Sequence, residues 1–187
     1  MAEPHLPDPV LLVVAIFSRH PDALAWARQR LEQLFSSVTL VSETYNFDQT
    51  AYYEPSMGPG LRKQFLVFHD LMPADCLPEV KLHTNAIEEE LAHANKYAEA
   101  RPLNLDPGAL TLGKFLLATT KDQAHRIFLR AGIYAEVTLR FQDGAFEPWP
   151  WTYADYCLPL VRAFLKEARD FYRHQLANPQ RKQRGMK

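Results

Sequence analysis

The residues best suited to chemistry lie between Leu103 and Trp151. Four of them could supply acid, base or metal ligation in a hydrolytic or phosphoryl-transfer reaction: Asp106, Asp122, His125 and Glu136. Basic side chains bind phosphate or carboxylate groups, and tryptophan faces stack on bases or sugars. The stretch therefore also offers candidate ligand-binding residues: Lys121, Arg126, Thr138, Arg140, Trp149 and Trp151. Their spacing specifies no reaction, so the catalytic roles stay open.

A near-match to a phosphate-binding loop lies in the same stretch. Gly108 and Lys114 fit the G-x-x-x-x-G-K half of that motif, in which glycine amides surround phosphates and the next Ser or Thr binds magnesium. The residue after Lys114 is a phenylalanine, so the metal-binding hydroxyl is missing. Asp106 and Pro107 are instead typical of a helix start, because Asp caps free amides and Pro fits the first turn. The pattern predicts a buried helix that ends near Ala118.

The turn at 130–132 sets the register of the strands that follow. If these residues form a three-residue loop, Ile127 lies opposite Ala135 and apolar partners share one face. A two-residue loop would set Ile127 opposite Glu136, and we reject it for that reason. The accepted register places Arg126 opposite Glu136 on the second face.

The turn at 143–144, an Asp-Gly pair typical of a type I′ hairpin, would place Arg140 opposite Glu147. One face of a three-stranded meander would then carry two charge pairs, a threonine and two aromatic residues, with His125 on the opposite side. This face is either a ligand site or a solvent-facing sheet whose ion pairs contribute about 0.2 to 1 kcal/mol each. The solvent-facing sheet is favoured. The two tryptophans are likewise better suited to covering the end of the sheet than to stacking a base.

The order of the elements indicates the fold. The Val-rich run at 10–17 is typical of a strand buried on both faces. Apolar residues at helical spacing predict a helix that ends at Ala98. The Glu88 to Glu90 triplet of this helix is expected to face solvent. The other predicted elements are a helix at 21–35, strands at 38–47 and 62–69, a long ordered loop at 48–60, a short strand at 103–105 and a C-terminal helix at 159–176.

Strand, helix, strand, strand, helix, strand is the ferredoxin-like split-βαβ order. We therefore expect an α+β single domain in which that core is extended by the three-stranded antiparallel meander and the C-terminal helix. Another open α+β sheet is the alternative.

Composition bounds the domain organisation and the compartment. A chain of 187 residues fits one domain, which we place at 10–177, between a proline-rich loose arm at 1–9 and a basic disordered tail at 178–187. The formal charge of -1 creates no whole-molecule field for nucleic acid or membranes. The two distant cysteines exclude a disulfide framework and a four-cysteine zinc site, so a reducing cytoplasm is expected. No apolar run approaches the roughly 20 residues that span a bilayer, and no membrane partner is expected.

Five segments carry a resemblance to a known family: MGPGLRKQF, NLDPGALTL, LATTKDQAHRIFL, GIYAEVTL and FEPWPWTYADY. With them the chain resembles the bacterial domain of unknown function family 4416 from Val10 to Leu176. The resemblance implies no established activity and no catalytic residues, although similar proteins sometimes carry an automatic GTP-binding label. Members often have alanine where this chain has Gly113, which weakens the phosphate-loop interpretation.

Three functions remain open on sequence. The leading hypothesis is a binding module for an anionic ligand, either a nucleotide or RNA. The second is a protein-protein interaction role without a small ligand. The third is a hydrolase or phosphoryl-transfer enzyme that uses the four candidate catalytic residues. Neither a cofactor nor an oligomeric state follows from the sequence.

Overall fold

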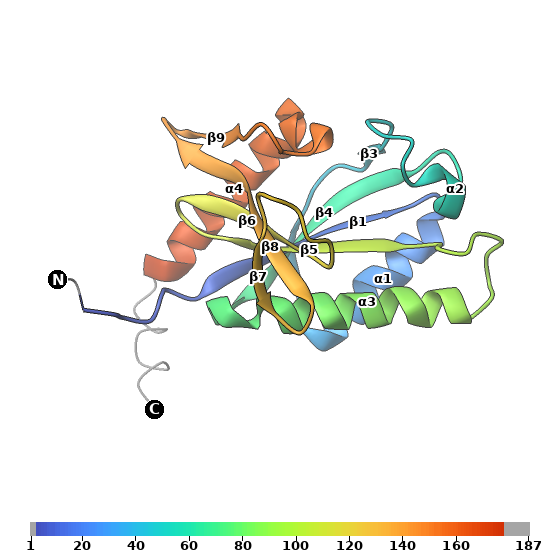
Figure 1. The fold of residues 1–187 in the computed structure, drawn as a ribbon, viewed down its shortest axis with the longest axis horizontal. Coiled ribbons are helices and arrows are strands. Elements are labelled where there is room, and N and C mark those ends of the chain that lie inside the picture. The colour runs from blue at the N-terminus through green and yellow to red at the C-terminus, as the bar shows by residue number, and fades with distance from the viewer. Residues whose placement is uncertain (1–2, 178–187) are drawn as a thin grey trace.

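The computed structural model describes residues 3–177 and is built on one large antiparallel sheet (Figure 1). The strands in this part of the chain run in the order β2-β4-β1-β5-β6-β8-β7, with β3 paired to β4 and β9 paired to β8. Their bounds are β1 Val10–Ser18, β2 Val38–Val41, β3 Tyr45–Asn46, β4 Arg62–Met72, β5 Asn104–Leu110, β6 Lys114–Thr119, β7 Ile127–Arg130, β8 Ile133–Gln142 and β9 Ala145–Pro148. The helices are α1 Pro21–Leu34, α2 Glu54–Met57, α3 Leu77–His93 and α4 Pro159–Ala177, with short 3-10 helices at Ala74–Cys76 and Ala154–Cys157.

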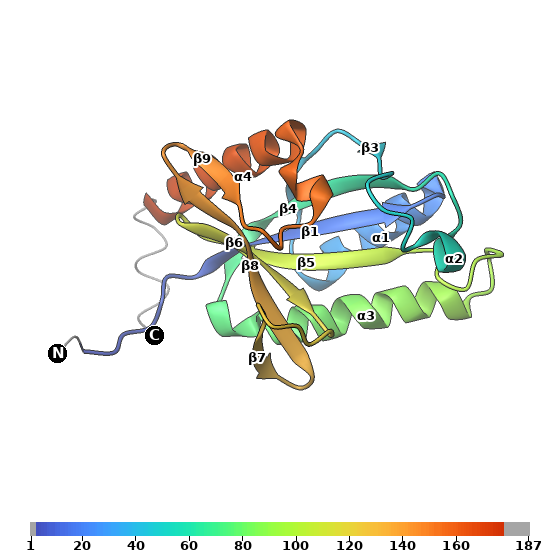
Figure 2. The same ribbon diagram turned by 45° about the horizontal axis from the view of Figure 1, so that its top comes forward.

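Helices cover both faces of the sheet. In Figure 2, α1 and α3 lie on one side and α4 on the other. Because side chains of a strand alternate between faces, Leu12 and Val14 of β1 join the core under α1 and α3, whereas Leu11 and Val13 join the core under α4. All nine residues of β1 are buried, which explains the uninterrupted apolar run that the sequence shows at this strand.

The α+β class predicted from the sequence is confirmed. Helix α1 connects β1 to β2, and α3 connects β4 to β5. In each case a third strand lies between the connected pair: β4 separates β1 from β2, and β1 separates β4 from β5. The sheet then continues through β6 and β8, with β7 and β9 both paired to β8. The predicted strand at 38–47 is divided into β2 and β3.

The predicted helix between Pro107 and Ala118 is wrong, because this stretch forms strands β5 and β6 and the turn between them. Strand β5 pairs with β1 at seven consecutive positions, from Leu110 opposite Leu11 to Asn104 opposite Phe17. These partners lie far away in the sequence, so the local Asp-Pro capping signal is overridden by sheet pairing. The G-x-x-x-x-G-K near-match therefore spans a hairpin and not a strand-to-helix loop.

Pro107 marks the point where β5 and β6 part. The backbone N–H of Leu105 donates to Glu88 Oε1 at 2.7 Å and its carbonyl accepts from Lys81 Nζ at 2.9 Å, so these groups face away from β1. In an antiparallel ladder, the backbone N–H and C=O groups of alternate residues point toward the same neighbouring strand. Pro107, two residues after Leu105, therefore points its backbone toward β6, but it has no N–H to donate. The β5 ladder to β6 accordingly ends at Gly108 opposite Leu117.

Gly108 is required by close packing within this hairpin. A Cβ atom at this position would lie 2.5 Å from the carbonyl oxygen of Leu116 and 2.5 Å from the Phe115 ring. We expect Gly108→Ala to lower the free energy of unfolding by about 1 to 3 kcal/mol, as overpacking does in other cores. Gly113→Ala is the matched control, because nothing lies within 4 Å of its Cβ position. Urea unfolding of both variants measures the difference, and equal stabilities would contradict the packing described here.

The turn between β7 and β8 differs from the predicted three-residue loop. Arg130 pairs with Ile133, and the two residues between them, Ala131 and Gly132, have φ values of 51° and 75°. This is the two-residue loop that the sequence interpretation rejected. The predicted pairing of residues 127 and 135 is nevertheless observed, because β7 has an irregularity at Leu129 that restores the register. The predicted turn at 143–144 is confirmed, with positive φ at both residues.

The predicted long loop after β3 is ordered by its aromatic residues. Phe47, Met57 and Leu61 form a small core with Phe17 of β1, and Tyr53 packs against it. This cluster holds the segment 47–57 beside the sheet. Residues 3–9 form no helix or strand, and the predicted basic tail at 178–187 lies outside the described residues.

Candidate functional site

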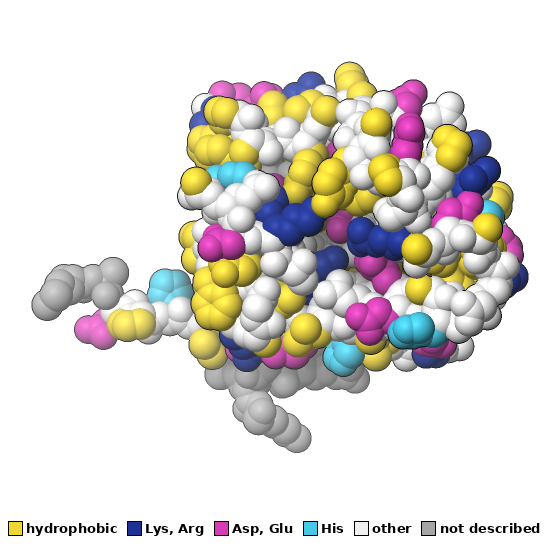
Figure 3. Space-filling view, turned by 45° about the vertical axis from the view of Figure 1, so that its right-hand side comes forward, with side chains coloured by type: hydrophobic (Ala, Val, Ile, Leu, Met, Phe, Trp, Pro, Cys, Tyr) yellow, Lys and Arg dark blue, Asp and Glu magenta, His cyan; other side chains and the backbone are white. Residues whose placement is uncertain are grey.

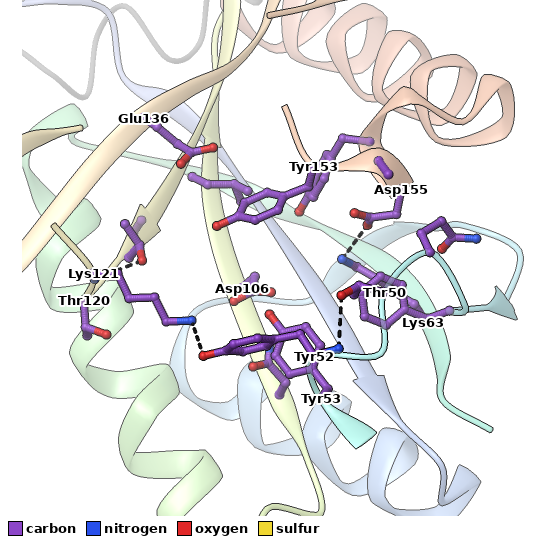
Figure 4. A pocket seen from close by; sticks show the side chains of 18 of the residues that line it. Thr50, Tyr52, Tyr53, Lys63, Asp106, Thr120, Lys121, Glu136, Tyr153 and Asp155 are labelled. Carbon is purple, nitrogen blue, oxygen red and sulfur yellow. Dashed lines mark hydrogen bonds and ion pairs between the residues drawn. The ribbon is translucent and has the colours of Figure 1, made fainter. Parts of the chain in front are cut away.

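A cavity of about 420 Å³ opens where β5 and β6 part. Figure 3 shows Lys and Arg side chains gathered around a hollow in the surface, with acidic side chains beside them. Figure 4 shows how side chains from the loop after β3, from β4 and β5, from the loop after β6, and from β8 and the 3-10 helix at Ala154–Cys157 converge on it. The charged residues of its lining are Lys63, Lys81, Arg101, Lys121, Asp106, Glu136 and Asp155.

One wall is built on a buried ion pair. Lys63 of β4 donates from Nζ to Asp155 Oδ2 at 2.7 Å, and both side chains are almost fully buried. Four aromatic rings lie within 5.7 Å of the same ammonium group, which gives it cation-π contacts in place of water. The Tyr45 hydroxyl donates to the same Asp155 oxygen at 3.4 Å, and burial together with this carboxylate raises the pKa of Tyr45 above its ordinary value.

A second wall is built on the Glu136 carboxylate of β8. Arg126 Nε donates to Glu136 Oε2 at 2.8 Å, and both side chains are buried. The other two nitrogens of this guanidinium donate to the Lys121 carbonyl at 3.0 Å and the Tyr153 hydroxyl at 2.7 Å. His125 Nε2 lies 3.2 Å from the same Glu136 oxygen. Arg126 therefore ties the loop after β6 and the segment at Tyr153 to the sheet.

Asp106 occupies the open part of β5 and faces the cavity (Figure 4). Its side chain is 27% exposed, and its nearest cation is Lys81 of α3, whose Nζ lies 3.7 Å from Oδ1. Within residues 3–177, no side chain or backbone group donates a hydrogen bond to it. The other two cavity carboxylates, Glu136 and Asp155, have close cationic partners. Asp106 is thus the acidic group with most bonding capacity left for a ligand.

The rim carries a lysine that has a phenol as its partner. Lys121 Nζ donates to the Tyr52 hydroxyl at 2.9 Å and lies 4.4 Å from the centre of that ring. The hydrogen bond from Lys121 lowers the pKa of Tyr52. Burial has the opposite effect on Tyr53 and Tyr153, because desolvation of the phenolate raises the pKa of both. Among the described residues, Lys121 forms no ion pair with a carboxylate, so its charge remains available at the mouth.

Side chains of α3 support the open edge of β5. Glu88 accepts a hydrogen bond from the Leu105 N–H, and it forms an ion pair with Arg101, whose Nη2 donates to Glu88 Oε2 at 2.8 Å. Burial raises the pKa of Glu88, against the effects of Lys81 and Arg101. The prediction that the whole Glu88 to Glu90 triplet faces solvent is therefore wrong for Glu88, whose side chain is 11% exposed.

Several predicted site residues meet at the cavity. Asp106, Lys121 and Glu136 line it, Arg126 and Thr138 lie behind Glu136, and the Thr138 hydroxyl donates to Glu136 Oε1 at 3.3 Å. The favoured solvent-facing interpretation of this face is wrong for the pair formed by Arg126 and Glu136, because both side chains are buried. His125 reaches Glu136 because β7 begins only at Ile127 and His125 lies on a turn.

Other predicted site residues lie elsewhere. Asp122 is exposed and does not line the cavity. Arg140 lies opposite Glu147 as predicted, but its guanidinium stacks over the Trp149 ring at 4.7 Å, and Glu147 instead has Arg162 at 3.8 Å.

The two tryptophans form part of a stack of planar groups on the outside of β8. The rings of Trp149 and Trp151 are 5.3 Å apart and nearly parallel, and His125 stacks on the other side of Trp151 at 5.4 Å. Trp151 Nε1 also donates to the Val137 carbonyl at 3.1 Å. Protein groups already contact the ring faces that a base would need, so these residues cover the sheet.

Sequence reasoning missed most of the cavity wall: Tyr53, Lys63, Lys81, Arg101, Asn104, Tyr153 and Asp155. One signal was present in α3. Its buried residues follow helical spacing at Leu77, Val80, Thr84, Ile87 and Leu91, and Lys81 and Glu88 fall within the same stripe. A charged residue on the buried side of a helix indicates a partner inside the protein.

The described part of the chain holds no group of three or more His, Cys, Asp or Glu residues that could hold a metal ion. Within the same residues, no helix is both long and apolar enough to cross a membrane. Cys76 and Cys157 are free thiols.

Comparison with known proteins gives one family match. A family model described as "Domain of unknown function (DUF4416)" matches residues 8–172. Searches of curated proteins and of solved structures find no significant match.

Proposed function

The chain belongs to the domain of unknown function family DUF4416, and this membership assigns no activity. From the cavity, we propose that the protein binds a small anionic ligand of the nucleotide class. The observation that carries the proposal is that Lys121, which lacks a carboxylate partner among the described residues, stands at the mouth of a 420 Å³ cavity. Small-molecule sites commonly measure about 300 to 1,000 Å³.

The charge of the lining supports an anionic ligand. Four cationic side chains face three carboxylates there. Two of those carboxylates are neutralised by close partners, Lys63 at Asp155 and Arg126 at Glu136. The third remaining cation, Arg101, pairs with Glu88 outside the lining at 2.8 Å. Among the described residues of the lining, Lys81 and Lys121 then have only Asp106 between them, which leaves positive charge for a phosphate group. Because the site is partly desolvated, a charge-assisted contact there is stronger than it would be in water.

The aromatic residues support a ligand with a flat ring. The rings of Tyr52 and Tyr53 meet edge to face at 5.0 Å, and Tyr153 lines the cavity across from them (Figure 4). Aromatic side chains bind bases by stacking. A single nucleotide suits this enclosed space better than an RNA strand, since the tryptophans expected to hold a strand are stacked on each other. The free cysteines are compatible with the cytosol, where we propose that the protein acts.

Calorimetric titration with ribonucleoside 5′-monophosphates tests this function. Wild-type protein is expected to bind at least one of them, and Lys121→Ala is expected to weaken binding about 10-fold or more, because it removes a charged hydrogen bond to phosphate. Lys166→Ala is the matched control, because Lys166 is an exposed lysine of α4 that does not line the cavity. Absence of binding by wild type, or equal binding by Lys121→Ala, would contradict the proposal.

An interaction role is the second candidate, and β7 is the observation that favours it. This strand ends the sheet and exposes Ile127 and Phe128 to 72% and 56%. Unpaired apolar edges are sites of strand addition. Light scattering over a range of concentrations would support this role if the protein associates and Phe128→Glu abolishes the association. A monomer at all concentrations would rule against self-association through β7.

A further inference from the structure

We infer that Asp106 and Asn104 form a subsite which recognises two neighbouring hydrogen-bond donors on the ligand, such as the vicinal hydroxyls of a ribose. This inference rests on the proposed function, since it concerns the same cavity. Both residues belong to β5 and both line the cavity. Being two positions apart in a strand, their side chains project from the same face.

Asp106 supplies the acceptors. An ionised carboxylate can accept about four hydrogen bonds, yet no donor among the described residues bonds to this one, and its nearest cation is 3.7 Å away. Glu136 in comparison has close contacts from Arg126, His125 and Thr138. A carboxylate with open bonding capacity inside a cavity favours ligands that bring donors, and two adjacent hydroxyls can use both of its oxygens.

Asn104 supplies a donor beside those acceptors. This residue is 1% exposed, and its side-chain Oδ1 accepts a hydrogen bond from Arg101 Nη2. Because a guanidinium only donates, this contact fixes which end of the amide is oxygen. The Nδ2 group has no partner among the described residues. Buried polar groups are normally paired, so this amide is expected to bond to a ligand or water.

The same chemistry fits two parts of a nucleotide. A hydroxyl both donates and accepts, so a ribose diol can donate to Asp106 and accept from Asn104. The N–H edge of a guanine base also presents two neighbouring donors. The shared requirement is a donor pair facing the Asp106 carboxylate, and analogues that lack one source or the other distinguish them.

The test is calorimetric titration of the full chain with the best-binding ribonucleoside 5′-monophosphate and its 2′,3′-dideoxy analogue. Wild type is expected to bind the ribonucleotide about 10- to 100-fold more tightly, because the analogue leaves the carboxylate unpaired. Asp106→Asn, which keeps the side-chain shape, is expected to reduce this ratio to within about threefold. Asp122→Asn, at an exposed position outside the cavity, should keep the wild-type ratio. Circular dichroism at matched temperature verifies that each variant is folded.

The outcomes separate this inference from the proposed function. The donor-pair subsite would be overturned if two results occur together in wild type: the ribonucleotide and its dideoxy analogue bind equally, and guanosine and inosine monophosphates bind equally. That outcome would leave the proposed binding of an anionic ligand intact. Retained discrimination in Asp106→Asn would overturn the donor-pair subsite as well. If Asp106→Asn instead removes a preference for guanosine over inosine monophosphate, the donor pair is on the base. Failure of every nucleotide to bind wild type would overturn both proposals.

Discussion

Arg126→Met is expected to lower the free energy of unfolding by about 3 to 5 kcal/mol, the range found when one partner of a buried ion pair is removed. Within the described part of the chain, the variant leaves the buried Glu136 carboxylate with only His125 and Thr138 as side-chain partners. It also removes the bonds that hold the Lys121 carbonyl and the Tyr153 hydroxyl. Methionine keeps the length and apolar character of the stem, so the loss reports on the guanidinium. Urea unfolding by circular dichroism measures it.

Arg140→Met is the matched control for this prediction. It is the same substitution at an exposed arginine of β8, which stacks on Trp149 and has no close carboxylate partner among residues 3–177. Its expected cost is below about 1 kcal/mol. The double variant Arg126→Met with Glu136→Leu should recover part of the loss, because no unpaired charge is then buried. Equal costs for the two single arginine variants would contradict the role described for Arg126.

Asp155→Ala is expected to be similarly damaging, at about 3 to 5 kcal/mol. The substitution leaves the Lys63 ammonium buried among aromatic rings without its only carboxylate partner among the described residues. Cation-π contacts offset part of the cost of desolvating the ammonium group. Unlike a carboxylate, however, the aromatic rings carry no opposite charge and accept no strong hydrogen bond from its N–H groups. Thermal or urea unfolding measures the change. Adding Lys63→Met to Asp155→Ala should restore stability, since the isolated charge is removed.

Asp170→Ala is the control for the second prediction. Asp170 pairs with Arg173 at 3.1 Å on the exposed surface of α4, where ion pairs contribute about 0 to 1 kcal/mol. A cost for Asp155→Ala that is no larger than this control would show that the aromatic rings alone hold Lys63, and would contradict the account of this wall.

The sequence predicted the parts of the fold that depend on local pattern. The Val-rich β1, the helical spacing of α1, α3 and α4, and the Asp-Gly turn at 143–144 are each specified by residues close together in the chain. The helix expected after Asp106 failed because β5 pairs with β1, about 90 residues earlier, and long-range pairing overrides a local cap. A cap signal alone cannot reveal whether a distant strand is available to pair.

The candidate site could be predicted only in part for the same reason. The register of the predicted meander places Glu136 on its polar face, Asp106 is a candidate at a strand end, and Lys121 is a candidate ligand-binding residue. All three line the cavity. The opposite wall comes from Lys63 and Tyr52, far earlier in the chain, and no sequence spacing reports that approach. Arg126 is a candidate ligand-binding residue on sequence, and its buried guanidinium has three hydrogen-bond partners that come from separate segments of the chain.

The most direct test of the central claim is amide chemical-shift mapping of isotope-labelled protein during titration with a ribonucleoside 5′-monophosphate. We predict saturable shifts clustered around the cavity, at residues 50–53, 104–106, 119–123 and 153–156. Shifts confined to β7 and the tryptophan stack, shifts confined to the basic segment 178–187, or no shifts at all would contradict the claim that this cavity binds the ligand.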